Sequence, residues 1–182
     1  DNPAELALSQ SSLDLWHQWG PRMNADQPTC QFTNCGTLWV AANAEEMAAA
    51  EDKQERLRAH GIACELLGPA ALAAAEPLLR PGLAGALKVS GDSVVYAPNA
   101  AEWLLTHAPR PIRFEQAEVT RIAGRTVHLA DGSQRSAGAV LLAAGIEAPR
   151  LCPGLPIRPK KGHLAITERH PGLLRHQLVE LG

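Results

Sequence analysis

The chain has 182 residues, of which 46% are hydrophobic and 20% are charged, and its formal net charge is −2. This composition can bury a core, and it offers no basic surface for nucleic acid. No stretch approaches the roughly 18 apolar residues that cross a bilayer, and the first residues do not resemble a signal peptide. We therefore expect a folded, cytoplasmic protein that binds no nucleic acid.

The cysteines and histidines are dispersed along the chain. The four cysteines form no C-x-x-C pair and the seven histidines form no H-x-x-x-H pair. Zinc sites usually take their ligands from such closely spaced pairs. The sequence therefore predicts free, mostly buried thiols and no metal site.

Hydrophobic spacing predicts four helices in the first 107 residues. Asn43 can cap the longest of them and Gly61 can end it, while Pro77 stops the third helix and Pro98 starts the fourth. The expected helices cover residues 9–19, 44–59, 69–75 and 100–107.

Short apolar segments between these helices predict strands. Residues 31–42 are expected to form a hairpin-like pair around Asn34-Cys35-Gly36, with 37–41 as its firmer strand. The other expected strands cover residues 84–89, 93–96 and 112–115.

The following residues, 118–151, predict a small meander, a buried strand and a short helical turn. Strands are expected at 118–122 and 126–129, with a hairpin turn at Asp131-Gly132. The run Ala-Val-Leu-Leu-Ala-Ala-Gly at 139–145 is typical of a strand covered on both faces, and its small last residues would let a ribose or phosphate lie against bare backbone. Plain packing of a strand onto a helix is the alternative explanation of that run.

These segments together predict an α+β fold. We expect a mixed, largely antiparallel sheet with flanking helices, together with part of a nucleotide-binding α/β sheet. Residues 155–167, in which prolines favour an extended backbone, are expected to lead into a further strand at Gly162.

The order of the motifs resembles the central part of the FAD-dependent oxidoreductases of the D-amino-acid oxidase type, which include glycine oxidase and sarcosine oxidase. The resemblance covers nearly the whole chain and lies in the order and spacing of the motifs. The matching segments are Gly36 to Ala41, Gly61 to Leu67, Glu76-Pro77-Leu78-Leu79, Val94 to Pro98, Val119 with Ile122, Val140 to Gly145 with Leu151, and Pro159 to Gly162.

The chain departs from this family in two respects. It contains no G-x-G-x-x-G turn to hold the FAD pyrophosphate, and it stops at Gly182, where a family member would continue into the rest of its substrate domain and a closing flavin-binding segment. We therefore expect the middle of a larger flavoenzyme. The resemblance implies a helical lead-in from the FAD domain (1–35), a substrate-type domain (36–116), a meander and strand of the FAD-binding domain (117–155), and return strands of the substrate domain (156–182).

The resemblance also implies roles for individual residues. It places the Val119 strand beside the adenine, Ala143 to Gly145 beside the ribose and pyrophosphate, and the strand at Gly162 and His163 near the isoalloxazine. The expected cofactor-binding residues are thus Val119, Ala143, Ala144, Gly145 and Gly162. His163 is the expected substrate-binding residue, with a packed or solvated histidine as the alternative. No catalytic residue is assigned, because the flavin performs the redox step.

The resemblance implies an enzyme that oxidises the C–N bond of a small amino acid or secondary amine with FAD, either as an oxidase or as a dehydrogenase. Its partners would be that substrate and the remaining FAD-binding segments of the parent chain. The 182-residue chain alone is expected to be inactive, to hold FAD poorly and to self-associate. The alternative is a non-catalytic α+β binding or interaction module, which the absent glycine turn favours.

Overall fold

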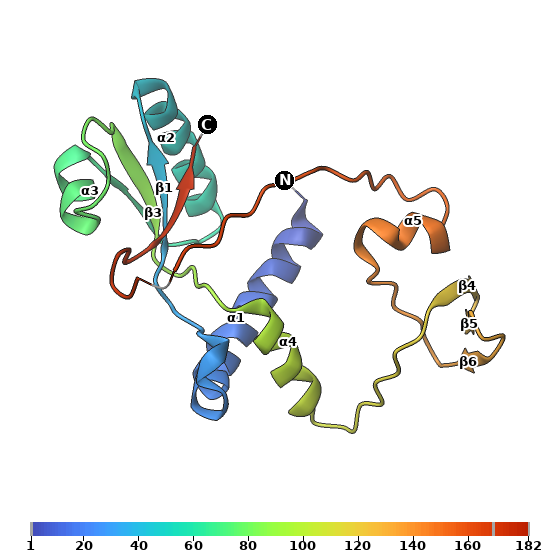
Figure 1. Ribbon diagram of the computed structural model, residues 1–182. Helices are drawn as coiled ribbons and strands as arrows, with labels where there is room; N and C mark the ends of the chain where they lie inside the picture. Colours follow the sequence, from blue (N-terminus) through green and yellow to red (C-terminus); the bar gives the residue numbers. More distant parts are fainter. Residues whose placement is uncertain (1, 169, 182) are drawn as a thin grey trace. The chain divides into compact units, whose positions relative to one another are not determined.

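The computed structural model describes residues 2–168 and 170–181 and divides into two compact units. The first unit comprises residues 1–110 and 169–182, and the second comprises residues 111–168. The second unit is thus inserted in the sequence of the first (Figure 1). Among the described residues, no helix is long and apolar enough to cross a membrane.

A four-stranded sheet forms the centre of the first unit, with the strand order β2-β3-β1-β7. β3 pairs antiparallel with both β1 and β2, whereas β7 pairs parallel with β1. This mixed, largely antiparallel sheet with flanking helices confirms the predicted fold class. The strands are β1 (Thr37–Ala41), β2 (Cys64–Leu67), β3 (Gly85–Val89) and β7 (Gln177–Glu180).

Helices α2 (Ala44–Ala59) and α3 (Pro69–Ala75) cover opposite faces of this sheet (Figure 1). A Cβ atom on Gly85 would lie 2.9 Å from the sulfur of Met47 in α2, whereas the neighbouring Ala86 packs in one cluster with Leu72 of α3. Adjacent strand residues point to opposite faces, so the two helices lie on different sides.

The boundaries of α2 confirm its prediction from sequence. The side chain of Asn43 accepts a hydrogen bond from the Glu46 amide at 2.9 Å, and the Glu46 carboxylate accepts one from the Ala42 amide at 2.7 Å. These contacts satisfy amides that a helix start leaves free. Gly61, with φ +73°, follows the end of the helix.

A second core joins three further helical segments of the first unit: α1 (Pro3–Asp26), η1 (Pro28–Cys30) and α4 (Ala97–Thr106). α1 is longer than predicted at both ends, and Asn2 caps its start by accepting a hydrogen bond from the Ala4 amide (3.1 Å). The buried residues of this core are Met23, Cys30, Ala100 and Trp103, with Trp16 and Trp19 packed against them.

The second unit contains the predicted meander. Its sheet order is β4-β5-β6, with both pairs antiparallel, and Gly132 in the turn between β5 and β6 has φ +84°. A short helical stretch follows, as predicted. The elements are β4 (Val119–Ala123), β5 (Thr126–Leu129), β6 (Gln134–Ser136), η2 (Gly145–Glu147) and α5 (Ala148–Leu151).

Two strands predicted in the second unit are not formed. Residues 139–144 and 162–167 carry no strand, and Leu141 and Leu164 are 93% and 88% exposed, so the prediction of a buried strand at 139–145 was wrong for this chain. A strand requires a neighbour for its backbone hydrogen bonds, and no described segment pairs with either stretch. The local sequence alone does not supply that neighbour.

Three further strand predictions were also wrong. Thr33 does not fold back on residues 37–41 as a hairpin but forms an isolated bridge with Val94, so the strand predicted at 93–96 is not formed. Residues 112–115 form no strand, and Phe114 is 74% exposed. In each case the local sequence favours a strand, but the strand does not form because the segment lacks a neighbouring strand to pair with.

Candidate functional site

A cavity of about 340 Å³ lies in the second unit between the meander and the segment that follows it. It brings together three of the predicted cofactor-binding residues, Val119, Ala143 and Ala144. Val119 starts β4, while the two alanines come from the extended segment that precedes η2. The remaining lining residues are Ile122, Val127, Val140, Leu141, Leu142 and Leu151.

Every residue that lines this cavity is apolar. A ligand there would meet aliphatic side chains and residues 140–144, whose backbone forms no strand. This combination suits a flat heteroaromatic ring such as adenine. The residues present therefore fit the adenine end of FAD.

The phosphate part of FAD finds no comparable support in the described residues. Gly145 follows the cavity with φ +54°, and no atom lies within 4 Å of where its Cβ would be, so its backbone is open to a ligand. However, α5 has four residues and the sequence contains no G-x-G-x-x-G turn. A pyrophosphate would need donors from elsewhere.

The other two predicted site residues are not brought to this cavity. Gly162 and His163 lie in the extended stretch 155–168, and both are exposed. A Cβ atom on Gly162 would contact nothing within 4 Å. The described residues therefore show no contact that would give His163 a fixed orientation.

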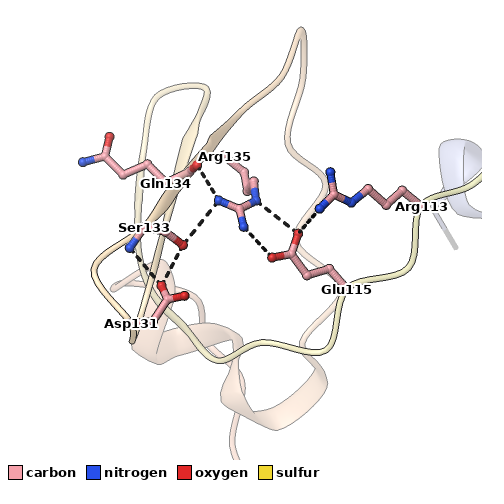
Figure 2. A network of polar contacts seen from close by, with 6 residues as sticks. All are labelled: Arg113, Glu115, Asp131, Ser133, Gln134 and Arg135. Atoms are coloured by element: carbon pink, nitrogen blue, oxygen red, sulfur yellow. Dashed lines mark hydrogen bonds and ion pairs between the residues drawn. The ribbon is translucent and has the colours of Figure 1, made fainter.

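A polar network holds the segment that leads into β4 against β6 of the meander (Figure 2). Arg135 of β6 donates to both carboxylate oxygens of Glu115, from Nη2 at 2.6 Å and from Nε at 3.1 Å. Arg135 Nη1 also donates to Ser133 Oγ at 3.3 Å, and Ser133 in turn donates to Asp131 Oδ1 from its amide and hydroxyl. The network links the approach to β4 with the opposite edge of the meander.

The charges in this network are already compensated. The hydrogen bonds from Arg135 hold the pKa of Glu115 below its ordinary value, and those from Ser133 do the same for the pKa of Asp131. The carboxylate of Glu115 in turn raises the pKa of Arg135. Glu115 and Arg135 pair with each other, so we interpret the network as a support for the Val119 strand and not as a binding site.

One polar residue of the first unit, Glu76, has contacts that the sequence does not predict. Glu76 belongs to a segment that carries the resemblance, yet no contact was predicted for it. Its side chain is 1% exposed. Its position in the sequence was the signal that could have predicted a contact. Glu76 stands between the alanine-rich helix α3 and Pro77, and a charged side chain in such an apolar setting needs a partner.

Among the residues that the structure describes, no three His, Cys, Asp or Glu side chains are arranged to hold a metal ion. The four cysteines are all free thiols, as predicted, but the prediction that most of them are buried was wrong. Cys30 is buried, Cys35 and Cys64 are half-buried and Cys152 is exposed.

Known structures share this fold. Glycine oxidase from Geobacillus kaustophilus is 26% identical with a TM-score of 0.69, covering 83% of this chain and 42% of its own. L-proline dehydrogenase from P. horikoshii is 16% identical with a TM-score of 0.67, covering 94% and 48%. Iminodiacetate oxidase from Chelativorans sp. is 18% identical with a TM-score of 0.62, covering 83% and 43%. The chain therefore spans less than half of each.

No curated protein matches the chain significantly. By contrast, the sequence profile of a family described as FAD dependent oxidoreductase matches residues 1–180. This match covers nearly the whole chain, and it agrees with the order of motifs that the sequence displays. The chain belongs to the FAD dependent oxidoreductase family.

Proposed function

We propose that the whole protein oxidises the C–N bond of a small amino acid or secondary amine, such as a D-amino acid, glycine or sarcosine. Family membership over residues 1–180 carries this proposal, and the apolar cavity at Val119, Ala143 and Ala144 supports it. When bound, FAD supplies the redox chemistry by accepting a hydride equivalent from the carbon next to the amine.

The residues of this chain would bind and orient the cofactor and the substrate. In our proposal the backbone at Val119, Ala143 and Ala144 holds the adenine and ribose, and the open backbone of Gly145 lies beside the ribose and pyrophosphate. Gly162 would allow close approach to the isoalloxazine, and His163 would contact substrate or flavin. The apolar lining of the cavity would contact the adenine faces.

The proposed domain boundaries agree in part with the two units. The proposed FAD-binding part, 117–155, lies within the second unit, and β7 lies in the unit that contains most of the proposed substrate domain, 36–116. We propose that 1–35 leads in from the FAD domain and that 156–182 returns the chain to the substrate domain.

An absorbance spectrum of the whole natural protein tests the function. We expect flavin bands in the near ultraviolet and blue that bleach when one substrate is added without oxygen. Glycine, sarcosine, D-alanine, L-proline and iminodiacetate form the test set, because proteins with this fold are named for glycine, L-proline and iminodiacetate. A colourless protein that cannot be reconstituted with FAD would favour a binding module instead.

The variant Ala144→Leu tests the cofactor site. Its larger side chain fills part of the cavity, so the dissociation constant for FAD should rise at least about tenfold, as overpacking of a fitted site implies. Ala137→Leu, at an exposed position outside the cavity, is the matched control and should leave FAD binding unchanged. Quenching of flavin fluorescence measures both, and equal affinities would exclude the cavity as the adenine site.

We also propose that the isolated 182-residue chain is inactive and holds FAD poorly. The described residues offer the adenine cavity without donors for the pyrophosphate, which is the charged and strongly hydrated part of the cofactor. Tight FAD binding by the isolated chain in the same fluorescence titration would contradict this.

A further inference from the structure

Glu76 is a buried carboxylate in the first unit with no place in the proposed chemistry. It follows the last residue of α3, and its side chain is 1% exposed. Burying a charged group is unfavourable unless hydrogen bonds replace the lost water. The partners of this carboxylate therefore indicate what it does.

Three donors from two adjacent residues converge on one oxygen of Glu76. Oε1 accepts the amide of Arg175 at 2.8 Å, the amide of His176 at 2.7 Å and Nδ1 of His176 at 2.8 Å. The second oxygen, Oε2, is buried and has no hydrogen-bond partner among the described residues. All the polar contacts of the carboxylate thus go to a segment about 100 residues further along the chain.

That segment leads directly into β7. The next residue, Gln177, donates its amide to the carbonyl of Gly36 at 3.0 Å and accepts the hydroxyl of Thr37 at 3.1 Å. At the other end of β7, the amide of Leu181 donates to the carbonyl of Val40 at 3.1 Å. β7 is an edge strand, so β1 is its single partner in the sheet.

We propose that Glu76 is a positioning residue that sets the register of β7 on β1. The carboxylate fixes the backbone of Arg175 and His176, and this places Gln177 opposite Thr37. A shift of one residue would turn every side chain of β7 to the other face of the sheet. An edge strand with one neighbour has ladder hydrogen bonds on one side, so an anchor beyond the ladder adds to what holds its register.

The position of β7 in turn shapes a cavity of about 510 Å³ in the first unit. Leu178, Val179 and Glu180 of β7 form one part of its wall, while Leu79 and Arg80, just after Glu76, form another. Glu76 therefore joins two parts of this wall that are far apart in sequence. This proposal does not depend on the redox function.

Amide hydrogen exchange in the whole natural protein, with and without the Glu76→Ala substitution, tests the anchor. Removing the carboxylate leaves three N–H donors without their acceptor. Hydrogen bonds to a charged group are among the stronger hydrogen bonds in proteins. We expect exchange at Gln177 and Leu181 to be about ten- to a hundredfold faster, with β3 amides unchanged. Glu76→Gln keeps an acceptor oxygen and should show a smaller increase.

Two further variants complete the experiment. Glu55→Ala removes an exposed carboxylate of α2 and should change no exchange rate in β7. His176→Ala removes one of the three donors, so it should speed exchange in β7 less than Glu76→Ala does, and it remains informative if Glu76→Ala does not fold. Unchanged exchange at Gln177 and Leu181 in all variants, or an equal increase in β3, would overturn the proposal.

Discussion

Glu115 and Arg135 form a two-pronged ion pair at the surface of the second unit. Because Arg135 donates two hydrogen bonds to it, the pKa of Glu115 lies below its ordinary value of 4.5. A carboxyl whose pKa is lower in the folded state contributes stability above its unfolded pKa, and this contribution is lost as the pH falls through the folded-state pKa. The support of the meander by this pair is therefore weakened in acid.

Arg135→Gln should raise the pKa of Glu115 toward 4.5, because the two charge-assisted hydrogen bonds are removed. Arg113 Nη2, which lies 4.0 Å from Glu115 Oε2, still lowers the pKa of Glu115 in this variant. A titration of the Glu115 carboxyl carbon by NMR measures this. Arg125→Gln, an exposed arginine between β4 and β5, is the control and should leave the titration unchanged. An unchanged pKa of Glu115 in Arg135→Gln would mean that the ion pair between Glu115 and Arg135 does not form in solution.

At the level of the elements, the close approach of β2 to β3 depends on a glycine. A Cβ atom at Gly85 would lie 2.3 Å from the carbonyl oxygen of Leu67, and φ at this residue is +155°. Gly85→Ala should therefore lower the free energy of unfolding by about 2–5 kcal/mol, through the clash and the strained backbone.

The control is Gly91→Ala, because a Cβ atom there would contact nothing within 4 Å. It should change the free energy of unfolding by no more than about 0.5 kcal/mol. Urea unfolding measures both variants. Equal midpoints for Gly85→Ala and Gly91→Ala would show that the two strands approach less closely than described.

The same elements show what the sequence can predict. The limits of α2 were predictable because Asn43, Glu46 and Gly61 carry their signals within a few residues of the helix ends. The strand at 139–145 was predicted from an equally clear local pattern and is absent. The difference is that a helix satisfies its own backbone, whereas a strand takes its hydrogen bonds from another segment.

The polar and apolar contacts of the molecule also divide into those that the sequence predicts and those that it does not. Val119, Ala143 and Ala144 line one cavity, and the resemblance supplied that grouping, while their binding of a cofactor stays a prediction. The contact between Glu76 and His176 links residues 100 positions apart, and no periodicity or turn signal near either one predicts it. Long-range polar contacts of this kind were found from the structure alone.

At the level of the whole molecule, the second unit exposes large apolar side chains. Leu141, Leu164, Ile166 and Phe114 are 93%, 88%, 87% and 74% exposed. Large apolar side chains exposed to water favour association. We expect the isolated 182-residue chain to form larger species as its concentration rises, measured by sedimentation velocity, whereas the whole flavin-loaded protein should not show this dependence. A strictly monomeric isolated chain at high concentration would contradict the prediction.

The insertion of the second unit also affects the order in which the sheet can form on the ribosome. Thr37 and its partner Gln177 are 140 residues apart, so at typical rates of synthesis roughly 7 to 28 seconds separate the two. During that time one edge of β1 has no strand beside it and can pair with another nascent chain. Slower translation of the codons for residues 111–168 would lengthen this interval, and a chaperone that covers β1 would protect it.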